Sequence, residues 1–228
     1  MANFPRNFDL TGTNVTANPL DPTFIFDEEK LYTVRESPGP SGIFQDFRVF
    51  EVYDDNKILL RATRKETPIS MRIKVQDLRG SSPRTIFILR KKILSMRTLF
   101  RVEKPELVGK SSSMATSEAT TYKKMMTMFE DNFRLYRRDV RIYTAKLDIR
   151  KAHIRFKDKQ KAVVAEATRV RWLNDIDEYK VRIGKGVDAL LILLGILSID
   201  ATLSIQEARQ RRNQAFKRVT NPKLYFNS

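Results

Sequence analysis

The amino-acid sequence predicts a mainly β fold of antiparallel hairpins, with one hydrophobic helix buried near the C-terminal end. The hairpins follow from residues 47–103, where short β-branched and aromatic runs alternate with turns rich in Asp, Asn, Gly and Pro. The helix follows from residues 189–199, an uncharged and mostly apolar run between Asp188 and Asp200. This run is apolar on all sides, which is typical of a helix surrounded by protein.

The apolar run is too short to cross a membrane as a helix. A membrane-spanning helix needs about 20 apolar residues, so a buried core helix is favoured and a transmembrane or re-entrant segment is the alternative. Asp188 is predicted to be the N-cap or first-turn acid of this helix. Gly184 and Gly186 ease the turn into the helix and lack the further glycines of a phosphate-binding loop.

The strands are predicted from alternating or β-rich runs. In residues 152–158, for example, Ala152, Ile154 and Phe156 alternate with basic side chains, so one face is buried and the other is basic. On this basis strands are expected at 30–35, 47–53, 57–65, 69–78, 84–92, 93–103, 140–149, 152–158 and 161–170.

Residues 122–136 have a different rhythm, which predicts a helix. Six Met and aromatic side chains recur there at helical spacing, namely Tyr122, Met125, Met126, Phe129, Phe133 and Tyr136. The favoured interpretation is an amphipathic surface helix within an insertion at 105–139. A docking surface for a protein partner, made of flexible Met and aromatic side chains, is the alternative.

Composition limits the classes of protein to consider. A chain of 228 residues, 41% of them hydrophobic, is long enough for one large domain or two small ones with a real core. The absence of Cys excludes disulfides, thiolate metal sites and a Cys nucleophile. It also fits a reducing intracellular setting. The first fifteen residues lack the apolar run of a secretory signal, so a cytoplasmic location is expected.

The distribution of charge points to an anionic partner. The formal net charge of +16 favours a membrane surface, a nucleic acid or an acidic protein. Residues 1–45 are net acidic, whereas residues 61–104 and the segment from 205 onward are strongly basic. The basic charge therefore belongs to the predicted strands and to the tail.

Three segments together resemble a known family. They are DFRVFEVYDDNKILLRATRK (46–65), VQDLRGSSPRTIFILRKKILSMRTLFRVE (75–103) and residues 162–200, where a Tyr-x-Val strand leads into Gly-Val-Asp and the apolar run. The most specific piece is 90–97, in which basic residues precede a hydrophobic pair, Ser and Arg. In order and spacing these segments resemble the LURP-one-related branch of the tubby C-terminal-like superfamily, with phospholipid scramblases as cousins.

The resemblance implies a closed antiparallel β-barrel that encloses the hydrophobic helix at 187–203. It divides the chain into an extended Pro-rich arm (1–27), a barrel domain (28–204) that carries the 105–139 insertion, and a basic tail (205–228). Closure would remove free strand edges in a β-rich chain.

The sequence predicts neither an enzyme nor a cofactor. His153 is the single histidine, and it lies in a predicted strand beside Arg155 and Lys157, so a surface histidine is expected. Nucleophilic catalysis with a His base and a His-based metal site would each need a partner that the sequence does not provide.

A calcium site is one hypothesis for the segment before the helix, because the resemblance places the proposed calcium-binding segment of scramblases there. The candidate ligands are Asn174, Asp175, Asp177, Glu178 and Asp188. Calcium needs six to eight converging oxygens, and basic residues at 180, 182 and 185 intervene and oppose it. A polar turn is favoured, so no metal is predicted, and Asp175, Asp177 and Glu178 are the remaining candidates.

The better candidates are basic residues in and after neighbouring predicted strands. Seven are expected to gather on one face and bind a lipid headgroup, namely Arg72, Lys74, Arg90, Lys91, Lys92, Arg97 and Arg101. Charges of the same sign on one face oppose folding, which suggests that they are kept because they bind a partner. A solvated charged surface is the alternative. Through tubby, the resemblance implies an anionic lipid or phosphoinositide as that partner.

Three functions follow, of which peripheral binding to anionic lipid, at the plasma membrane, is favoured. The alternatives are a cytosolic or nuclear protein-interaction module that uses the 105–139 insertion, and a scramblase-like lipid-handling protein. Scrambling is disfavoured because the helix is too short to span a bilayer and palmitoylatable Cys residues are absent. Nucleic acid is disfavoured because Phe87, Phe100 and Tyr53 follow an apolar strand rhythm rather than that of an RNA-stacking platform.

Overall fold

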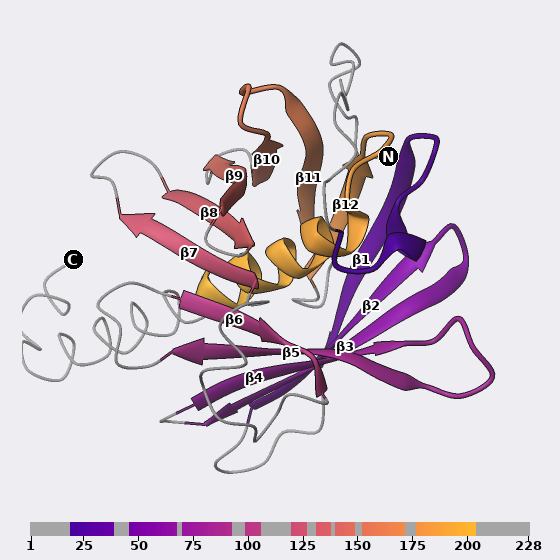
Figure 1. Ribbon diagram of the computed structural model, residues 1–228. Helices are drawn as coiled ribbons and strands as arrows, with labels where there is room; N and C mark the ends of the chain where they lie inside the picture. The colour runs from indigo at the N-terminus through magenta and orange to yellow at the C-terminus, as the bar shows by residue number, and fades with distance from the viewer. Residues whose placement is uncertain are drawn as a thin grey trace, which may run out of the picture.

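The computed structural model describes residues 19–38, 46–67, 70–92, 99–105, 120–126, 131–137, 140–148, 152–171 and 177–203. Within these ranges the fold is mainly β, with one antiparallel sheet and a helix at residues 189–203 (Figure 1). The prediction of a mainly β fold with a hydrophobic C-terminal helix is confirmed. Most of the arm, much of the 105–139 segment and the basic tail lie outside the described residues.

The described part of the sheet contains twelve strands, and a short 3-10 helix, η1 (Pro22–Phe24), precedes them. The strands are β1 (Lys30–Pro38), β2 (Asp46–Asp54), β3 (Lys57–Thr67), β4 (Ser70–Asp77), β5 (Arg84–Lys92), β6 (Leu99–Glu103), β7 (Thr120–Met126), β8 (Asp131–Arg137), β9 (Val140–Asp148), β10 (His153–Lys157), β11 (Val163–Arg171) and β12 (Asp177–Ile183).

Strands that follow one another in sequence pair with one another in the sheet. The first strand also pairs with the last: β1 has β2 on one side and β12 on the other, with Lys30 opposite Ile183 and Arg35 opposite Glu178. The order of neighbours therefore runs around the sheet and returns to β1. All of these ladders are antiparallel, as expected for a chain of hairpins.

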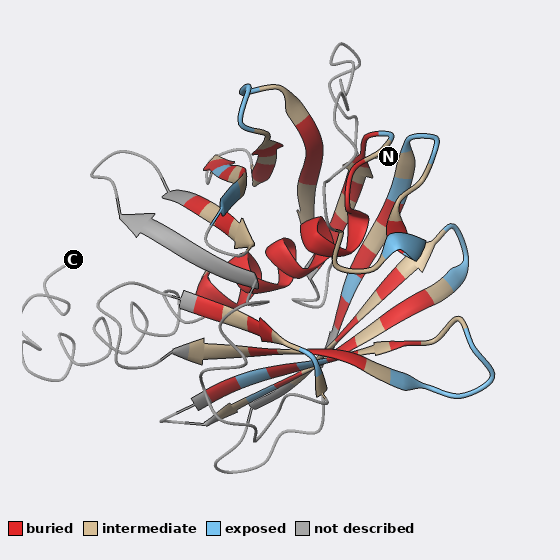
Figure 2. Cartoon of the chain, viewed as in Figure 1, coloured by how far each residue is buried: buried red, intermediate tan, exposed pale blue. Residues whose placement is uncertain are grey.

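Alternation along the strands separates an inner face from an outer face. On β4, for example, Met71, Ile73 and Val75 are buried, whereas Arg72 and Lys74 are exposed. This period of two is inherent in a β-strand, because successive side chains point to opposite faces. Figure 2 shows the resulting alternation of buried and less buried positions along the strands.

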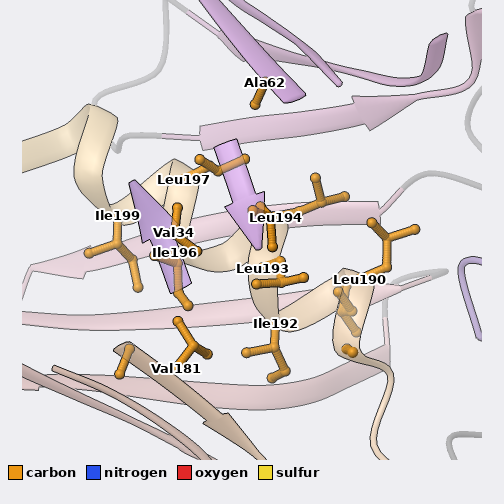
Figure 3. Packing of buried hydrophobic residues seen from close by; sticks show 14 of the residues in the cluster. Val34, Ala62, Val181, Leu190, Ile192, Leu193, Leu194, Ile196, Leu197 and Ile199 are labelled. Atoms are coloured by element: carbon orange, nitrogen blue, oxygen red, sulfur yellow. The ribbon is translucent and has the colours of Figure 1, made fainter. Parts of the chain in front are cut away.

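The inner face packs around the core helix, the name used below for residues 189–203. Its apolar side chains are almost completely buried, among them Leu190, Leu194 and Ile196, and Ala62 on β3 and Val181 on β12 belong to the same cluster (Figure 3). Full burial of one such Leu or Ile contributes about 1.5–3 kcal/mol. Among the described residues, no helix combines the length and the apolar character needed to cross a membrane.

The core helix begins at residue 189, two residues later than the resemblance implies, because Asp188 caps it. Asp188 Oδ1 accepts a hydrogen bond from the backbone N–H of Leu191 at 2.9 Å, which is the N-cap arrangement. Its Oδ2 accepts another from the backbone N–H of Leu20 at 2.7 Å. Burial raises the pKa of the Asp188 carboxyl, and these two hydrogen bonds oppose the rise. The predicted N-cap is thus confirmed.

A second aspartate fixes the other end of the core helix. The buried Tyr179 hydroxyl donates a hydrogen bond to Asp200 Oδ1 at 2.8 Å. The Arg64 guanidinium, with a side chain only 1% exposed, lies 3.6 Å from Asp200 Oδ2. Buried charges require such partners, so the two aspartates that bracket the apolar run in the sequence tie both ends of the helix to the rest of the fold.

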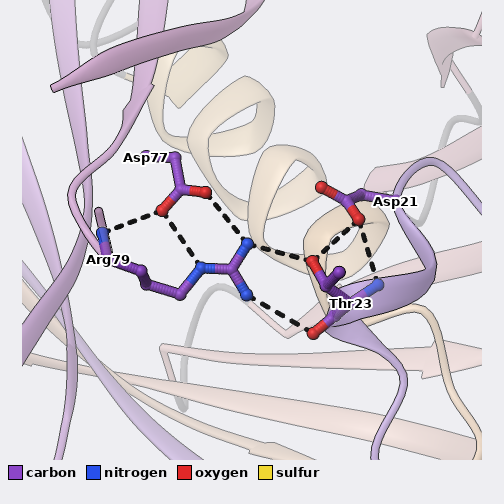
Figure 4. Close-up of polar contacts among 4 residues, drawn as sticks. All are labelled: Asp21, Thr23, Asp77 and Arg79. Carbon is purple, nitrogen blue, oxygen red and sulfur yellow. Dashed lines mark hydrogen bonds and ion pairs between the residues drawn. The ribbon is translucent and has the colours of Figure 1, made fainter. Parts of the chain in front are cut away.

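Residues 20–26 pack over the end of the sheet where the core helix begins. Figure 4 shows the polar contacts that link Thr23 of this segment to Arg79. Phe24 is fully buried beneath Arg79, whose guanidinium lies 4.0 Å from the ring centroid. Arg79 also donates hydrogen bonds to the Asp77 carboxylate and to Thr23 Oγ1, at 2.9–3.0 Å. Burial alone raises the pKa of Asp77, but the hydrogen bonds from Arg79 outweigh it and lower that pKa.

The predicted helix at 122–136 is wrong, because these residues form most of β7 and β8. The two strands pair with each other, and they lie between β6 and β9 in the sheet. Phe133 and Leu135 are both buried, two residues apart, which is strand periodicity rather than helix periodicity. The aromatic residues that suggested helical spacing are also strong strand formers, so tertiary pairing decided the outcome.

Candidate anion-binding surface

Four basic residues from four adjacent strands lie in register on the outer face of the sheet. Lys65 of β3 lies opposite Arg72 of β4. Arg72 in turn lies opposite Arg90 of β5, which lies opposite Arg101 of β6. Directly opposite residues project to the same face, with Cβ atoms about 5 Å apart. We refer to these four residues as the basic row.

Burial confirms that the basic row faces outward. The inner positions next to its members on β4, β5 and β6 are Ile73, Leu89 and Val102, and all three are buried. The row members on β3 and β4 are exposed, and those on β5 and β6 are partly exposed. Lys74, two residues along β4 from the row, is also exposed and widens the basic surface.

The charges of the basic row are compensated unevenly, since Lys65 makes an interaction within the fold and, of the other three members, only Arg90 does so among the described residues. Among the residues that the structure describes, no hydrogen bond or ion pair engages the side chains of Arg72, Lys74 or Arg101. Arg90 has one acidic neighbour, because its Nε lies 3.1 Å from Glu103 Oε2. Like charges directly opposite one another destabilise a sheet, so the row opposes folding rather than supporting it.

The structure places four of the seven predicted binding residues together: Arg72, Lys74, Arg90 and Arg101 share the outer face. Lys65, which begins the row, is not among the seven predicted residues. The signal was present, because Lys65 alternates with the buried Ala62 and Arg64 of β3 and so belongs to its outer face. The pairing of β3 with β4 then brings it opposite Arg72.

The other three predicted binding residues are not part of the described row. Lys91 alternates with Arg90 and lies opposite the buried Phe100, so it belongs to the inner-facing positions near the end of β5. Its assignment to one face with the others was therefore wrong, since consecutive strand residues point to opposite faces. The backbone of Lys92 pairs with Leu99, but its side chain, like the whole of Arg97, lies outside the described residues.

A second row on the outer face has charges of alternating sign. It runs across β12, β1, β2 and β3 through Glu178, Arg35, Glu51 and Arg61, which lie opposite one another in that order. Arg35 Nε lies 3.1 Å from Glu178 Oε2, and Arg61 Nη2 lies 2.8 Å from Glu51 Oε1. We refer to these four residues as the alternating row. Its charges are matched within the fold, and this makes it a poor candidate for binding an external ion.

The structure gives no support to the calcium candidates. Glu178 is buried, with 2% of the residue exposed. Its carboxylate pairs with Arg35 and with Lys180, whose Nζ lies at 2.9 Å. Asp175 and the side chain of Asp177 lie outside the described residues. Within the described ranges, no group of three or more His, Cys, Asp or Glu residues is arranged to hold a metal ion.

The prediction of a surface position for His153 is wrong in one respect. His153 does alternate with the inward-facing Ile154, but it is buried, because it lies between Asp148 of β9 and Thr168 of β11. Its Nε2 lies 3.9 Å from Oε1 of Glu166, a fully buried carboxylate. Two arginines, at 155 and 182, also approach Glu166 within 3.3–3.6 Å, so this group is an ion-pair cluster of the sheet rather than a His–nucleophile pair.

The described residues thus form an antiparallel sheet packed around a hydrophobic C-terminal helix, with charged side chains on the outer face. The family model of the LURP-one-related proteins matches residues 41–200. The chain therefore belongs to the LURP-one-related family, a branch of the tubby-like superfamily, as the sequence motifs suggested. Comparisons with curated proteins and with solved structures give no match.

Proposed function

We propose that this protein is a non-catalytic module that binds anionic lipid through the basic row, as a peripheral protein on the cytoplasmic leaflet of the plasma membrane. The observation that carries the proposal is the register of the row, which aligns like charges on four adjacent strands. Because that alignment opposes folding, its retention is explained by a partner that neutralises it.

The dimensions of the basic row suit an extended anionic surface. Three inter-strand spacings separate its ends, which makes the row about 15 Å wide. Several phosphate groups of a membrane can lie along such a width at once. Each basic residue near an anionic membrane contributes about 1 kcal/mol, and the net charge of +16 attracts the whole molecule to such a surface.

The residue types favour phosphate-rich headgroups, and phosphoinositides are the finer proposal. Three of the four row members are arginines. An arginine guanidinium matches the geometry of a phosphate with two parallel hydrogen bonds, which a lysine ammonium does not provide. Scrambling of lipid is a poorer proposal, since the core helix is buried inside the sheet.

Vesicle co-sedimentation tests the proposal. The wild type should bind vesicles of phosphatidylcholine mixed with phosphatidylserine, bind phosphoinositide-containing vesicles more tightly, and ignore pure phosphatidylcholine. The double variant Arg72→Ser and Arg101→Ser should bind about thirty-fold more weakly, since it loses two surface charges that contribute about 1 kcal/mol each. Lys57→Ser with Lys159→Ser is the matched control, because both lysines are exposed at hairpin turns away from the row.

Salt supplies the second arm of the test. Binding through exposed charges should weaken as ionic strength rises, because the screening length falls to about 8 Å at physiological salt. Salt-insensitive binding, equal weakening in the control variant, or no binding at low ionic strength would contradict the proposal. The last result would favour the alternative of a protein-interaction module.

A further inference from the structure

Glu103 is the one carboxylate among the described outer-face residues of β4, β5 and β6. It lies on β6 two residues from Arg101, and therefore on the same face. Its direct neighbour across the ladder is Ile88 of β5, which lies opposite Lys74 of β4. Basic residues thus lie around Glu103, although none of them except Arg90 is paired with it.

In the described part of the chain, the ion pair between Glu103 and Arg90 is not supported by a hydrogen bond at Arg90 Nε. Arg90 Nε lies 3.1 Å from Glu103 Oε2, yet this buried Nε makes no hydrogen bond within the described residues. In the alternating row, by contrast, Glu51 Oε1 accepts two hydrogen bonds from Arg61, at 2.8 and 3.1 Å. Ion pairs with partly exposed members contribute little to stability, and both Glu103 and Arg90 are partly exposed.

We propose that Glu103 is an internal counter-ion that holds Arg90 in the free protein and releases it to a phosphate of the bound membrane. This inference rests on the proposed function of the basic row. A phosphomonoester, as in a phosphoinositide headgroup, carries more charge than a carboxylate, and a phosphate can accept two parallel hydrogen bonds from a guanidinium. Glu103 therefore lowers the affinity of the row for weakly charged membranes and restricts binding to strongly anionic ones.

The test compares two isosteric variants that change the net charge equally. Glu103→Gln should raise affinity for phosphatidylserine vesicles about five-fold, because Arg90 is no longer neutralised by a carboxylate and its whole charge is available to the membrane. Glu28→Gln is the control. Glu28 lies two residues before β1, its side chain is 72% exposed, and its partner is Lys30 rather than a member of the basic row. The control should change affinity less than two-fold, and circular dichroism should show both variants folded as the wild type.

A double-variant cycle shows whether Glu103 acts through Arg90. In an Arg90→Gln background, the gain from Glu103→Gln should fall below two-fold, because no guanidinium is left to release. A gain that persists at five-fold would mean general charge repulsion and would overturn the inference.

Two further outcomes separate this inference from the proposed function. If the wild type binds and Glu103→Gln binds no better than the control, the inference fails while the lipid-binding function stands. If neither the wild type nor Glu103→Gln binds anionic vesicles, both fail. Inorganic phosphate as a soluble competitor distinguishes a membrane from free phosphate, since only a free-phosphate site would be blocked at low millimolar concentration.

Discussion

The alternating row and the basic row meet on strand β3 and place their charges in opposite ways. In the alternating row each residue lies opposite a residue of the other sign. In the basic row each residue lies opposite another cation. Buried apolar side chains lie on the inner face beneath both rows, so packing against the core helix does not account for the difference. The comparison separates charges that stabilise this sheet from charges that are available to a partner.

The comparison also shows that exposure alone does not identify a binding surface. Arg35 of the alternating row has a side chain that is 46% exposed, whereas that of Arg90 in the basic row is 35% exposed. What distinguishes the two rows is the sign of the cross-strand neighbour. In the alternating row each arginine lies opposite a glutamate that neutralises it, whereas in the basic row no carboxylate lies directly opposite an arginine.

The largest effect is expected from removing the most buried charge of the alternating row. Glu178→Ala should lower the free energy of unfolding by about 2 kcal/mol, because it leaves Arg35 and Lys180 without their shared carboxylate. Both cations are partly exposed, so the loss is smaller than for a fully buried ion pair. Urea denaturation measures this. Glu29→Ala is the control, since Glu29 is half-exposed and its ion pair with Arg182 is long, at 3.9 Å. Equal losses of stability in both variants would contradict the comparison.

A smaller loss is expected at Arg35. Arg35→Ala should reduce the free energy of unfolding by about 1 kcal/mol, since it removes an ion pair with Glu178 and a contact with the Tyr53 ring at 5.4 Å. The measurement is again urea denaturation. A variant as stable as the wild type would show that the alternating row is not stabilising.

The basic row should respond in the opposite direction. Replacing Arg72 with Ser relieves repulsion from the residues opposite it on both sides, so the free energy of unfolding should stay constant or rise by about 0.5 kcal/mol. Arg101→Ser should behave in the same way. Differential scanning calorimetry at low salt measures the effect, which should shrink at high salt. A loss of stability above 1 kcal/mol would mean that the row has a structural role.

The smallest effect is a pH dependence that arises from Glu51 of the alternating row. The hydrogen bond from the Tyr53 hydroxyl, followed by those from Arg61, lowers the pKa of Glu51 from its usual 4.5. A lowered pKa in the folded state gives stability that is present above the usual pKa and lost as the pH falls through the folded-state pKa. The Tm of the wild type should therefore fall more steeply below pH 4.5 than that of Glu51→Gln; parallel profiles would contradict this.

Most of the fold could be predicted from the sequence because it follows local periodicity. Strands with a period of two and a run that is apolar on all sides carry their own signals, and both Asp188 and the core helix lie where those signals place them. Residues 122–136 were misread because their aromatic residues satisfy both periodicities over short stretches. The partner strands β6 and β9 decide between them, and pairing of distant segments is not a local property.

The candidate site was predictable in composition but not in geometry. Alternation along each strand places Arg72 and Lys74 on one face, and it would have separated Lys91 from Arg90. Register is different, because it depends on turn lengths and bulges such as the one between Val75 and Gln76. Only the register shows that the cations of four strands lie in one line, and only the register reveals Glu103 beside them.

The position of the core helix in the chain has a consequence for biosynthesis. All twelve described strands are encoded before it, so their apolar inner faces leave the ribosome before the segment that covers them. The pairing of β1 with β12 likewise joins segments that are synthesised far apart in time, and contacts of this kind form slowly. We expect the nascent chain to need chaperone protection until residue 200 has emerged, and a transcript truncated just before the helix to yield an aggregation-prone product.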